Sequence, residues 1–462
     1  MRVSTFLFPV LVLVGLCAAD ANEQLLSSKD QRELNLRRRE KSKSKPKLRP
    51  SKPRPKKPKR PKKNRKHRRK PKPRKPKDKD LFDVEFELQN FLVPASNTPE
   101  SDFGFRHMTA TLSVSPPNRK LILFGGLGNG GPNPPTPMNS DIFTLNVDEP
   151  DPWKQEWTTQ QTDDVVEKPW FTSTRGFVEI GKKKYLTCDD GDDNAVYGFD
   201  PETYKFKFLS RANDTLTNKF SAGDCCAVGH KVRGDERIYI MGGRNDASAG
   251  SPVTYTRYYS VTYDKWKMVT GLNDGRSHLG CVAVTGKNNK KLIYALGGAD
   301  SPNGEAKSSI EVYDVKKDKW TDLETSLSEG RTRMAVQNVD DKYIMVIGGD
   351  ATCPGGTGAM CASDQPLTTV EVIDIGDYHN ILTAEDGVPQ LIKRRQTPAT
   401  VLREIKSGDQ KTRYELYVIA GRTNNDNFTD QGVLNTTEIL RFNGIQGREP
   451  RPRPKSKISN YS

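Results

Sequence analysis

The feature that most constrains this chain is a short apolar segment that ends in two glycines and recurs along the sequence. KLILFGG, RIYIMGG, LIYALGG and YIMVIGG end at Gly126, Gly243, Gly298 and Gly349. Two weaker copies are LYVIAGR, in which Ala420 precedes Gly421, and KYLTCDDGDD, which lies between the first and second strong copies. Six copies at a spacing of about fifty residues predict an array of repeated structural units.

The surroundings of each copy are also alike. Another short apolar strand precedes it, often introduced by an arginine, as in RTRMAVQNV and RSHLGCVAV. An alternating strand follows, often with a later aromatic residue, as in SSIEVYDVKKDKWTDL. Each unit therefore offers four short strands and almost no helix, which predicts an all-β protein. Neighbouring four-stranded units can bury one another's faces, whereas one unit alone cannot.

The glycine pair, the Tyr-Asp that follows it and the later tryptophan resemble the kelch repeat over most of residues 82–445. The copy from Arg276 to Leu323 matches best. This resemblance implies a six-bladed kelch-type β-propeller spanning residues 81–445, with one blade per repeat. The sixth copy lacks its outer strand, and LFDVEFELQNFLV at residues 81–93 is a candidate to replace it. We therefore expect an N-terminal strand to close the ring and remove an exposed edge.

Residues 1–21 have the pattern of a secretory signal peptide. Arg2 is followed by an apolar stretch from Phe6 to Leu16, and Ala19 and Ala21 satisfy the small-residue rule for cleavage. No later apolar run reaches membrane-spanning length. The sequence predicts a secreted, extracellular protein without a membrane span.

The charge is divided sharply along the chain. Residues 22–80 carry 28 Lys and Arg against six Asp and Glu, a net charge of +22. The whole chain carries +16 and residues 1–21 carry none, so residues 81–462 carry −6. We expect residues 22–80 to form a disordered basic arm rich in Lys, Arg and Pro, and residues 446–462 to form a disordered basic tail.

A polyanion is the partner that such an arm predicts. Behind a signal peptide nucleic acid is not expected, which leaves anionic extracellular glycans, acidic matrix proteins or a mineral with an acidic coat. The alternatives are a solvated spacer or a propeptide removed at LRRRE or KHRRK. The densest part of the predicted binding segment comprises Lys56, Lys57, Arg60, Lys62, Lys63, Arg65, Lys66, Arg68, Arg69 and Lys70.

Six cysteines remain after the signal peptide, and an even number in an exported chain favours disulfides. Cys353 and Cys361 bracket a glycine-rich loop and are a local pair. Cys225 and Cys226 are adjacent on an expected strand and point to opposite faces, so we expect each to bond a different partner. The remaining two are Cys188 and Cys281, and the sequence does not decide the connectivity. Four N-x-S/T sequons predict glycosylation at Asn213, Asn427, Asn435 and Asn460.

The tripeptide Arg233-Gly234-Asp235 has two interpretations. In an exported protein it suggests binding to an adhesion receptor. It also lies between two expected strands of the third repeat, where a hairpin turn favours Gly and Asp. The turn is the interpretation that the local pattern favours.

Arginines introduce the first strand of five repeats. In a propeller they could surround one mouth of the central channel and attract anions. The resemblance to the kelch family implies instead that they tie loops together, and this role is favoured. The five residues are Arg106, Arg175, Arg276, Arg331 and Arg395.

The acidic run CDDGDDN, which begins at Cys188, could supply oxygen ligands for calcium. Its spacing does not match an EF-hand loop, and the tip of a hairpin can be acidic without binding a metal. We assign no metal site and no cofactor to the chain.

No catalytic constellation is visible. Some kelch-like propellers are copper radical oxidases similar to galactose oxidase, but the five histidines of this chain are scattered and no two have ligand spacing. The sequence therefore favours a secreted, non-enzymatic binding or matrix protein. In this interpretation a propeller face binds a protein or glycan, and the arm binds a polyanionic scaffold, such as that of a mineralised matrix. A secreted carbohydrate-active or oxidase-like propeller enzyme is the alternative.

Overall fold

The structure is a computed structural model of the 462-residue chain. It describes residues 85–89, 108–113, 119–126, 141–149, 155–160, 176–188, 195–212, 224–245, 251–300, 305–351, 365–376, 379–406, 412–423 and 434–443. The chain divides into two units: residues 1–75, all outside the described ranges, and residues 76–462, which contain every described element.

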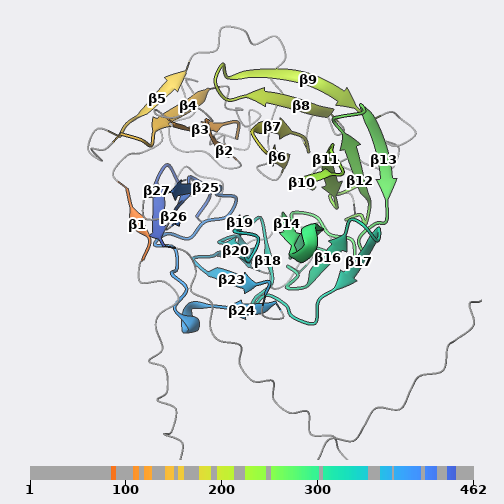
Figure 1. The fold of residues 1–462 in the computed structure, drawn as a ribbon. Coiled ribbons are helices and arrows are strands. Elements are labelled where there is room, and N and C mark those ends of the chain that lie inside the picture. The colour runs from red at the N-terminus through yellow and green to blue at the C-terminus, as the bar shows by residue number, and fades with distance from the viewer. Residues whose placement is uncertain are drawn as a thin grey trace, which may run out of the picture. The chain divides into compact units, whose positions relative to one another are not determined.

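Six antiparallel four-stranded sheets, the blades, surround a central axis in chain order (Figure 1). Blade 1 comprises β2 (Thr109–Leu112), β3 (Lys120–Phe124), β4 (Ile142–Asn146) and β5 (Trp157–Gln160). Blade 2 comprises β6 (Phe177–Ile180), β7 (Lys183–Leu186), β8 (Ala195–Asp200) and β9 (Lys205–Arg211). Blade 3 comprises β10 (Cys226–Val232), β11 (Asp235–Met241), β12 (Thr256–Ser260) and β13 (Lys265–Val269).

The remaining blades follow the same plan. Blade 4 comprises β14 (Gly280–Gly286), β15 (Lys290–Leu296), β16 (Ile310–Asp314) and β17 (Lys319–Asp322). Blade 5 comprises β19 (Ala335–Val339), β20 (Tyr343–Ile347), β23 (Val370–Asp374) and β24 (Asn380–Leu382). Blade 6 comprises β25 (Ala399–Lys406), β26 (Thr412–Ile419), β27 (Thr437–Phe442) and β1 (Glu87–Leu88).

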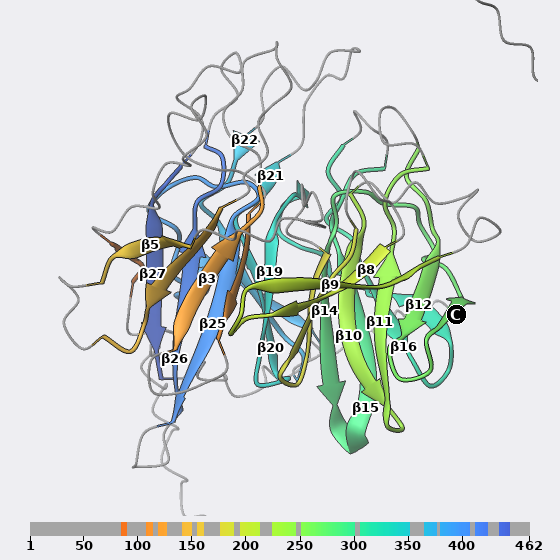
Figure 2. The ribbon, with the colours of Figure 1, turned by 90° about the horizontal axis from the view of Figure 1, so that it is seen from above.

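A small three-stranded sheet accompanies blade 5, formed by β18 (Arg331–Thr332), β21 (Asp350–Ala351) and β22 (Gln365–Pro366). In the view turned by 90°, β21 and β22 lie on one face of the ring of blades (Figure 2). The described helices are two short 3₁₀ turns, Lys287–Asn289 and Ala384–Asp386. No helix within the described ranges is long and apolar enough to cross a membrane.

The N-terminal strand closes the ring, as the sequence predicted. β1 pairs antiparallel with β27, and Glu87 lies opposite Ile439. Within the described part of this segment, residues 85–89, the pairing comprises Glu87 and Leu88, and Phe86 packs in the core between blades 5 and 6. The first and last strands of the propeller therefore share one sheet, and β27 is not an exposed edge.

The hydrophobic core consists of six clusters, one at each junction between neighbouring blades. The cluster between blades 3 and 4, for example, joins Tyr239 and Met241 to Tyr313 and Trp320. The tryptophan of the repeat also makes a polar bridge, because Trp320 Nε1 donates to the carbonyl of Thr270 at 3.0 Å. Each blade is stable because its neighbours cover both of its faces.

The glycine pairs allow neighbouring blades to approach closely. Gly297 and Gly298 have φ values of +57° and +93°, in the left-handed region. A Cβ atom on Gly297 would lie 2.4 Å from the carbonyl oxygen of Arg331 in the next blade. The imperfect copy has the same conformation, with φ values of +54° at Ala420 and +99° at Gly421. The glycine signal of the repeat is therefore a requirement of the junctions between blades.

Candidate functional site

Two cavities lie along the central channel of the propeller. The wall of the channel is made by the innermost strand of every blade: β2, β6, β10, β14, β19 and β25. A small cavity of about 130 Å³ lies toward the N-terminal ends of these strands, and a large cavity of about 700 Å³ lies toward their C-terminal ends. The large cavity is in the size range of sites for small ligands.

Both signs of charge line the large cavity. Arg119, Lys182 and Lys184 contribute cations, and Glu179 and Glu404 contribute carboxylates. Lys184 pairs with Glu179, which also accepts a hydrogen bond of 2.7 Å from Thr111 Oγ1. The three cations and two carboxylates leave the lining of the large cavity with a small excess of positive charge. The sequence prediction missed these residues, and the cationic hairpin GKKKY after β6 was the signal that could have indicated them.

The structure describes three of the five arginines that were predicted to surround the channel mouth. For these three, the prediction of an anion-binding role is wrong. Arg276, Arg331 and Arg395 are at most 1% exposed. Each forms an ion pair with a buried glutamate of its own blade, with Nη2–Oε1 distances of 2.7 Å for Arg276–Glu311 and 3.0 Å for Arg395–Glu438. Arg331 pairs in the same way with Glu371. These cations are buried and neutralised, so they do not form an anion-attracting mouth.

The same arginines connect the strands of the blade to one another and to the preceding blade. Nη1 of Arg276 donates to the carbonyls of Gly297 at 2.9 Å and Ser309 at 3.1 Å. The carbonyl of Arg276 accepts a hydrogen bond of 3.0 Å from Gly243 N in blade 3. Equivalent bonds lead from Gly298 N to Arg331 O and from Gly349 N to Arg395 O. This agrees with the tying role that the kelch resemblance implied.

Burial dominates the electrostatics of these pairs. It lowers the pKa of Arg331 and Arg395, although the neighbouring glutamates act in the opposite direction. It raises the pKa of Glu311, against the charge of Arg276 and the amide of Asn273. Such a pair is strongly destabilising when only one partner is removed, because the other charge remains buried.

Three side chains approach one another beside the small cavity, two residues before the inner strands of blades 3, 4 and 5. His278 Nε2 lies 2.8 Å from Asp224 Oδ1 and 3.4 Å from Arg333 Nη2. The three residues have left-handed φ values, and backbone bonds join His278 N to Asp224 O and Arg333 N to His278 O. An arc of hydrogen bonds therefore runs along the channel opening across three blades.

The Arg-Gly-Asp segment is a hairpin turn. Arg233 and Gly234 have φ values of +52° and +89° between β10 and β11. Asp235 is only 4% exposed, accepts a hydrogen bond of 2.5 Å from Ser260 Oγ and pairs with Arg237. The adhesion interpretation is therefore wrong for Asp235, because its carboxylate is turned into the blade. The turn interpretation agrees with the geometry.

Two disulfides connect three consecutive blades. Cys188, after β7, bonds Cys225, immediately before β10, and Cys226, the first residue of β10, bonds Cys281 in β14. The adjacent cysteines thus have different partners, as their opposite directions predicted. Blades 2, 3 and 4 are covalently joined close to the channel. Cys353 and Cys361 lie outside the described residues.

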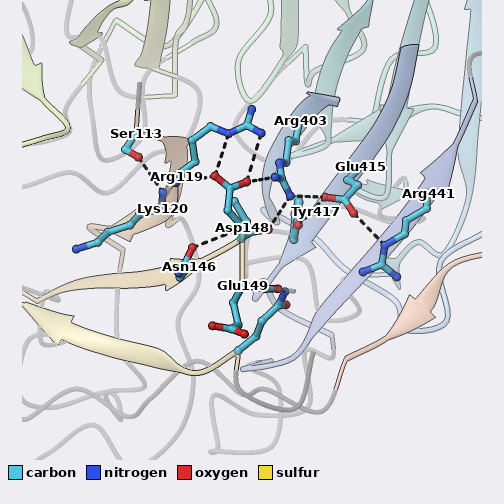
Figure 3. A network of polar contacts seen from close by, with 12 residues as sticks. Ser113, Arg119, Lys120, Asn146, Asp148, Glu149, Arg403, Glu415, Tyr417 and Arg441 are labelled. Carbon is cyan, nitrogen blue, oxygen red and sulfur yellow. Dashed lines mark hydrogen bonds and ion pairs between the residues drawn. The ribbon is translucent and has the colours of Figure 1, made fainter. Parts of the chain in front are cut away.

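A polar network fixes the junction between blades 6 and 1, where the ring closes (Figure 3). Asp148 pairs with Arg119, at 3.3 Å, and with Arg403. Glu415 pairs with Arg403 at 2.9 Å and with Arg441 at 3.0 Å. Arg441 also reaches Glu87 of β1 at 2.5 Å. The closing strand is thus joined to blade 1 through charges that cross all of blade 6.

Several predicted sites fall outside the described residues. Of the four sequons, only Asn435 is described; it is half-buried, and its glycosylation stays a prediction. Among the described His, Cys, Asp and Glu side chains, no group of three lies close enough to hold a metal ion. The calcium interpretation of CDDGDDN is untested, because all its residues after Cys188 are outside the described ranges, as are Arg106, Arg175 and the ten cations of the arm.

The geometry defines the class of protein as a six-bladed β-propeller with an N-terminal closing strand. A family model for the Kelch motif matches residues 275–326, which cover blade 4. Kelch-like protein 26 of Danio rerio is 24% identical over 174 residues, 37% of this chain and 26% of that protein. Kelch-like protein 34 of Homo sapiens is 26% identical over 183 residues, 37% of this chain and 25% of that protein.

Alpha-scruin of Limulus polyphemus is 27% identical over 165 residues, 35% of this chain and 16% of that protein. The matches to these three relatives therefore span about a quarter of their length or less. Together with the six repeated blades and their glycine pairs, the Kelch motif of blade 4 and these similarities support a kelch-type β-propeller.

Proposed function

We propose that this chain is a secreted, non-enzymatic binding protein of an extracellular matrix. Its basic arm binds a polyanionic scaffold and its propeller binds a protein or glycan partner. The observation that carries the proposal is the division of charge, +22 on residues 22–80 against −6 on residues 81–462. A dense cationic segment binds polyanions through many weak contacts and needs no folded site of its own.

The kelch relatives support a protein-binding role for the propeller. The buried arginines and glycine pairs support it indirectly, because they hold the blades together and leave the loops and outer strands to vary. The propeller is a scaffold on which different partners can be recognised, so its partner depends on those surfaces.

The proposed scaffolds are sulfated or otherwise anionic extracellular glycans and acidic matrix proteins, including those of a mineralised matrix. The export that this requires is supported by the signal-peptide pattern of residues 1–21. The two disulfides are in keeping with an oxidising compartment.

Salt-dependent binding to immobilised heparin tests the role of the arm. The full chain is compared with a variant in which the ten cations of the densest arm segment, from Lys56 to Lys70, are replaced by Gln. By analogy with other linear polyanions, the slope of log K against log salt should decrease by roughly 7 if all ten contribute. An unchanged slope would show that the arm is not the polyanion-binding segment.

A carbohydrate-active propeller enzyme is the second candidate function, and the Asp224–His278 pair is the observation that favours it. An imidazole 2.8 Å from a buried carboxylate is oriented as a general base would be. Hydrolysis of a panel of extracellular glycans by the wild type and by His278→Gln separates the two functions. The binding proposal predicts no turnover by either protein, and turnover that is lost in the variant would favour the enzyme.

A further inference from the structure

The outer strands of blades 2, 3 and 4 carry a concentration of exposed lysines. β9 reads KFKFLSR and β13 reads KWKMV, and neither contains an acidic residue, whereas β17 reads KWTD and carries one lysine and one aspartate. The outer strands of the other blades, β5, β24 and β1, read WTTQ, NIL and EL and carry no cation. We call six exposed lysines of this arc the basic rim and leave out Lys317, which pairs with Asp314: Lys205, Lys207, Lys265, Lys267, Lys316 and Lys319.

The basic rim is continuous from blade to blade. Trp266 Nε1 in β13 donates to Ser210 Oγ in β9 at 3.1 Å, and Thr270 N donates to Asp318 Oδ1 beside β17 at 2.9 Å. β9, β13 and β17 follow one another along the periphery of the ring (Figure 1). The two disulfides join the same three blades, so the relative positions of these strands are fixed.

Strand geometry sets a regular spacing for the cations. Lys205 and Lys207 are two residues apart on β9, as are Lys265 and Lys267 on β13, so each pair lies on one face of its strand about 7 Å apart. The turns before β13 and β17 also hold carboxylates, and, against the effect of burial, the charge of Lys267 helps to lower the pKa of Asp318. Asp264 accepts from Tyr259 Oη at 2.8 Å, and Asp318 accepts from Tyr313 Oη at 2.7 Å.

Exposed apolar side chains lie on the opposite face of the same two strands, because Phe208 follows Lys207 and Met268 follows Lys267. Phe208 on β9 is 42% exposed, Met268 on β13 is 37% exposed, and Tyr263 in the turn before β13 is 63% exposed. The face that carries the regularly spaced lysines suits a ligand that presents anionic groups at regular intervals. A sulfated polysaccharide has this chemistry, and lysine ammonium groups bind anions as point charges without strict orientation.

We propose that the basic rim of blades 2–4 is a binding surface for a sulfated polysaccharide, separate from the N-terminal arm. The inference rests on the proposed export of the protein, which makes such polymers available. In this proposal the polyanion contacts the folded surface of blades 2–4 as well as the arm. Blades 5, 6 and 1 remain accessible to other partners.

Lysine acetylation of the full chain, measured by mass spectrometry with and without a heparin oligosaccharide, tests this surface directly. We expect acetylation of Lys207, Lys265, Lys267 and Lys319 to decrease severalfold when heparin is present. Lys231 and Lys406 are the controls, because their side chains are 63% and 81% exposed at the ends of inner strands. Their acetylation should not change.

Substitution of the same four rim lysines by Gln in the full chain gives a second measurement. The slope of log K against log salt for heparin should decrease by about 3, by analogy with linear nucleic acids. The matched control replaces four exposed lysines elsewhere on the propeller, Lys183, Lys231, Lys342 and Lys406, and should keep the wild-type slope. Both variants should unfold at the wild-type temperature, since solvent-exposed substitutions change stability little.

The outcomes separate the rim from the arm. Protection of rim and arm lysines together supports both proposals. Protection of arm lysines alone, with a wild-type slope of log K against log salt for the rim variant, would contradict polysaccharide binding by the basic rim. The proposed function of the arm would be unaffected. Protection of rim lysines alone would support binding by the basic rim and contradict binding by the arm. Protection of no lysine would contradict both proposals.

Discussion

At the scale of single residues, the arginine that introduces a repeat is a buried ion-pair partner. Arg331 shows the consequence of this position clearly. Its guanidinium is fully buried and contacts two carboxylates, Glu371, which is 1% exposed, and Glu329, which is 36% exposed. The same cation therefore makes one desolvated and one solvated ion pair, and the two should differ greatly in their effect on stability.

We expect Glu371→Gln to lower the free energy of unfolding by about 3 kcal/mol, because it leaves the charge of Arg331 buried without its carboxylate. Glu329→Gln is the matched control and should cost less than about 1 kcal/mol, because that carboxylate is solvated. Urea denaturation of both variants measures the difference. Equal losses would contradict the assignment of Arg331 to a desolvated pair.

Asp148, in the network that joins blades 6 and 1, predicts a dependence of stability on pH. Burial raises its pKa, but hydrogen bonds from Arg119 and the charges of Arg403 and Arg119 outweigh this and hold the pKa below the ordinary 3.8. An acid whose pKa is lower in the folded state stabilises the fold when it is ionised. Its contribution is present above about pH 4 and is lost as the pH falls through the folded value.

The comparison of wild type with Asp148→Asn measures this contribution. The variant should be less stable than the wild type at neutral pH, and the difference should shrink as the pH falls below 3.8. Thermal unfolding across an acid pH series gives the result. A difference that stays constant down to the lowest pH would contradict the role of the Asp148 charge.

At the scale of the structural element, the end of the second strand in blades 3, 4 and 5 lies close against the backbone of the next blade. Gly348 has a φ of +57°, and a Cβ atom there would lie 2.5 Å from the carbonyl oxygen of Arg395. Gly181 has a similar φ of +64° in the β6–β7 turn, but a Cβ atom there would meet nothing within 4 Å. These two glycines separate the requirement for a left-handed backbone from the requirement for close approach.

Gly348→Ala should therefore be much more destabilising than Gly181→Ala. The latter should cost only about 1 to 2 kcal/mol for the left-handed conformation. The former adds a clash with a backbone atom that cannot move without shifting blade 6. Urea denaturation of the two variants makes the comparison, and similar losses would show that the blades do not meet closely at the glycine pair.

The repeat unit was the part of the structure that could be predicted from the sequence. The glycine pair, the four short strands and the absence of an outer strand in the sixth copy defined the ring and its closure, because these features are local and repeated. Burial of Arg276 could not be derived from its position, since its partner Glu311 is 35 residues away. The basic rim was missed for a related reason: its lysines are far apart in the sequence, and only the ring brings their strands together.

At the scale of the whole propeller, the closing strand unites the two ends of the folded unit. The two described residues of β1 cover the edge of β27, and the preceding Phe86 lies in the core. The ion pair of β1, Glu87–Arg441, is largely exposed and should contribute little by itself. The covering of the edge is thus the main contribution of this segment.

A chain that lacks residues 81–93 should consequently self-associate through the exposed edge of β27. Glu87→Gln is the control; it keeps the strand, should stay in the wild-type oligomeric state and should cost less than about 1 kcal/mol. Light scattering gives the mass of each species. A truncated chain that kept the wild-type mass and stability would contradict closure by the N-terminal strand.

We propose that a folded propeller works together with a retained polycationic arm, and the N-terminus of the protein that cells release is a direct test of this proposal. Intact-mass and peptide mass spectrometry of protein collected from the medium of expressing cells would locate this N-terminus. We expect a chain that begins near Asn22, with the arm attached to the propeller. A chain that begins near Leu81 would show that the arm is a propeptide and would contradict polyanion binding by the arm of the mature protein.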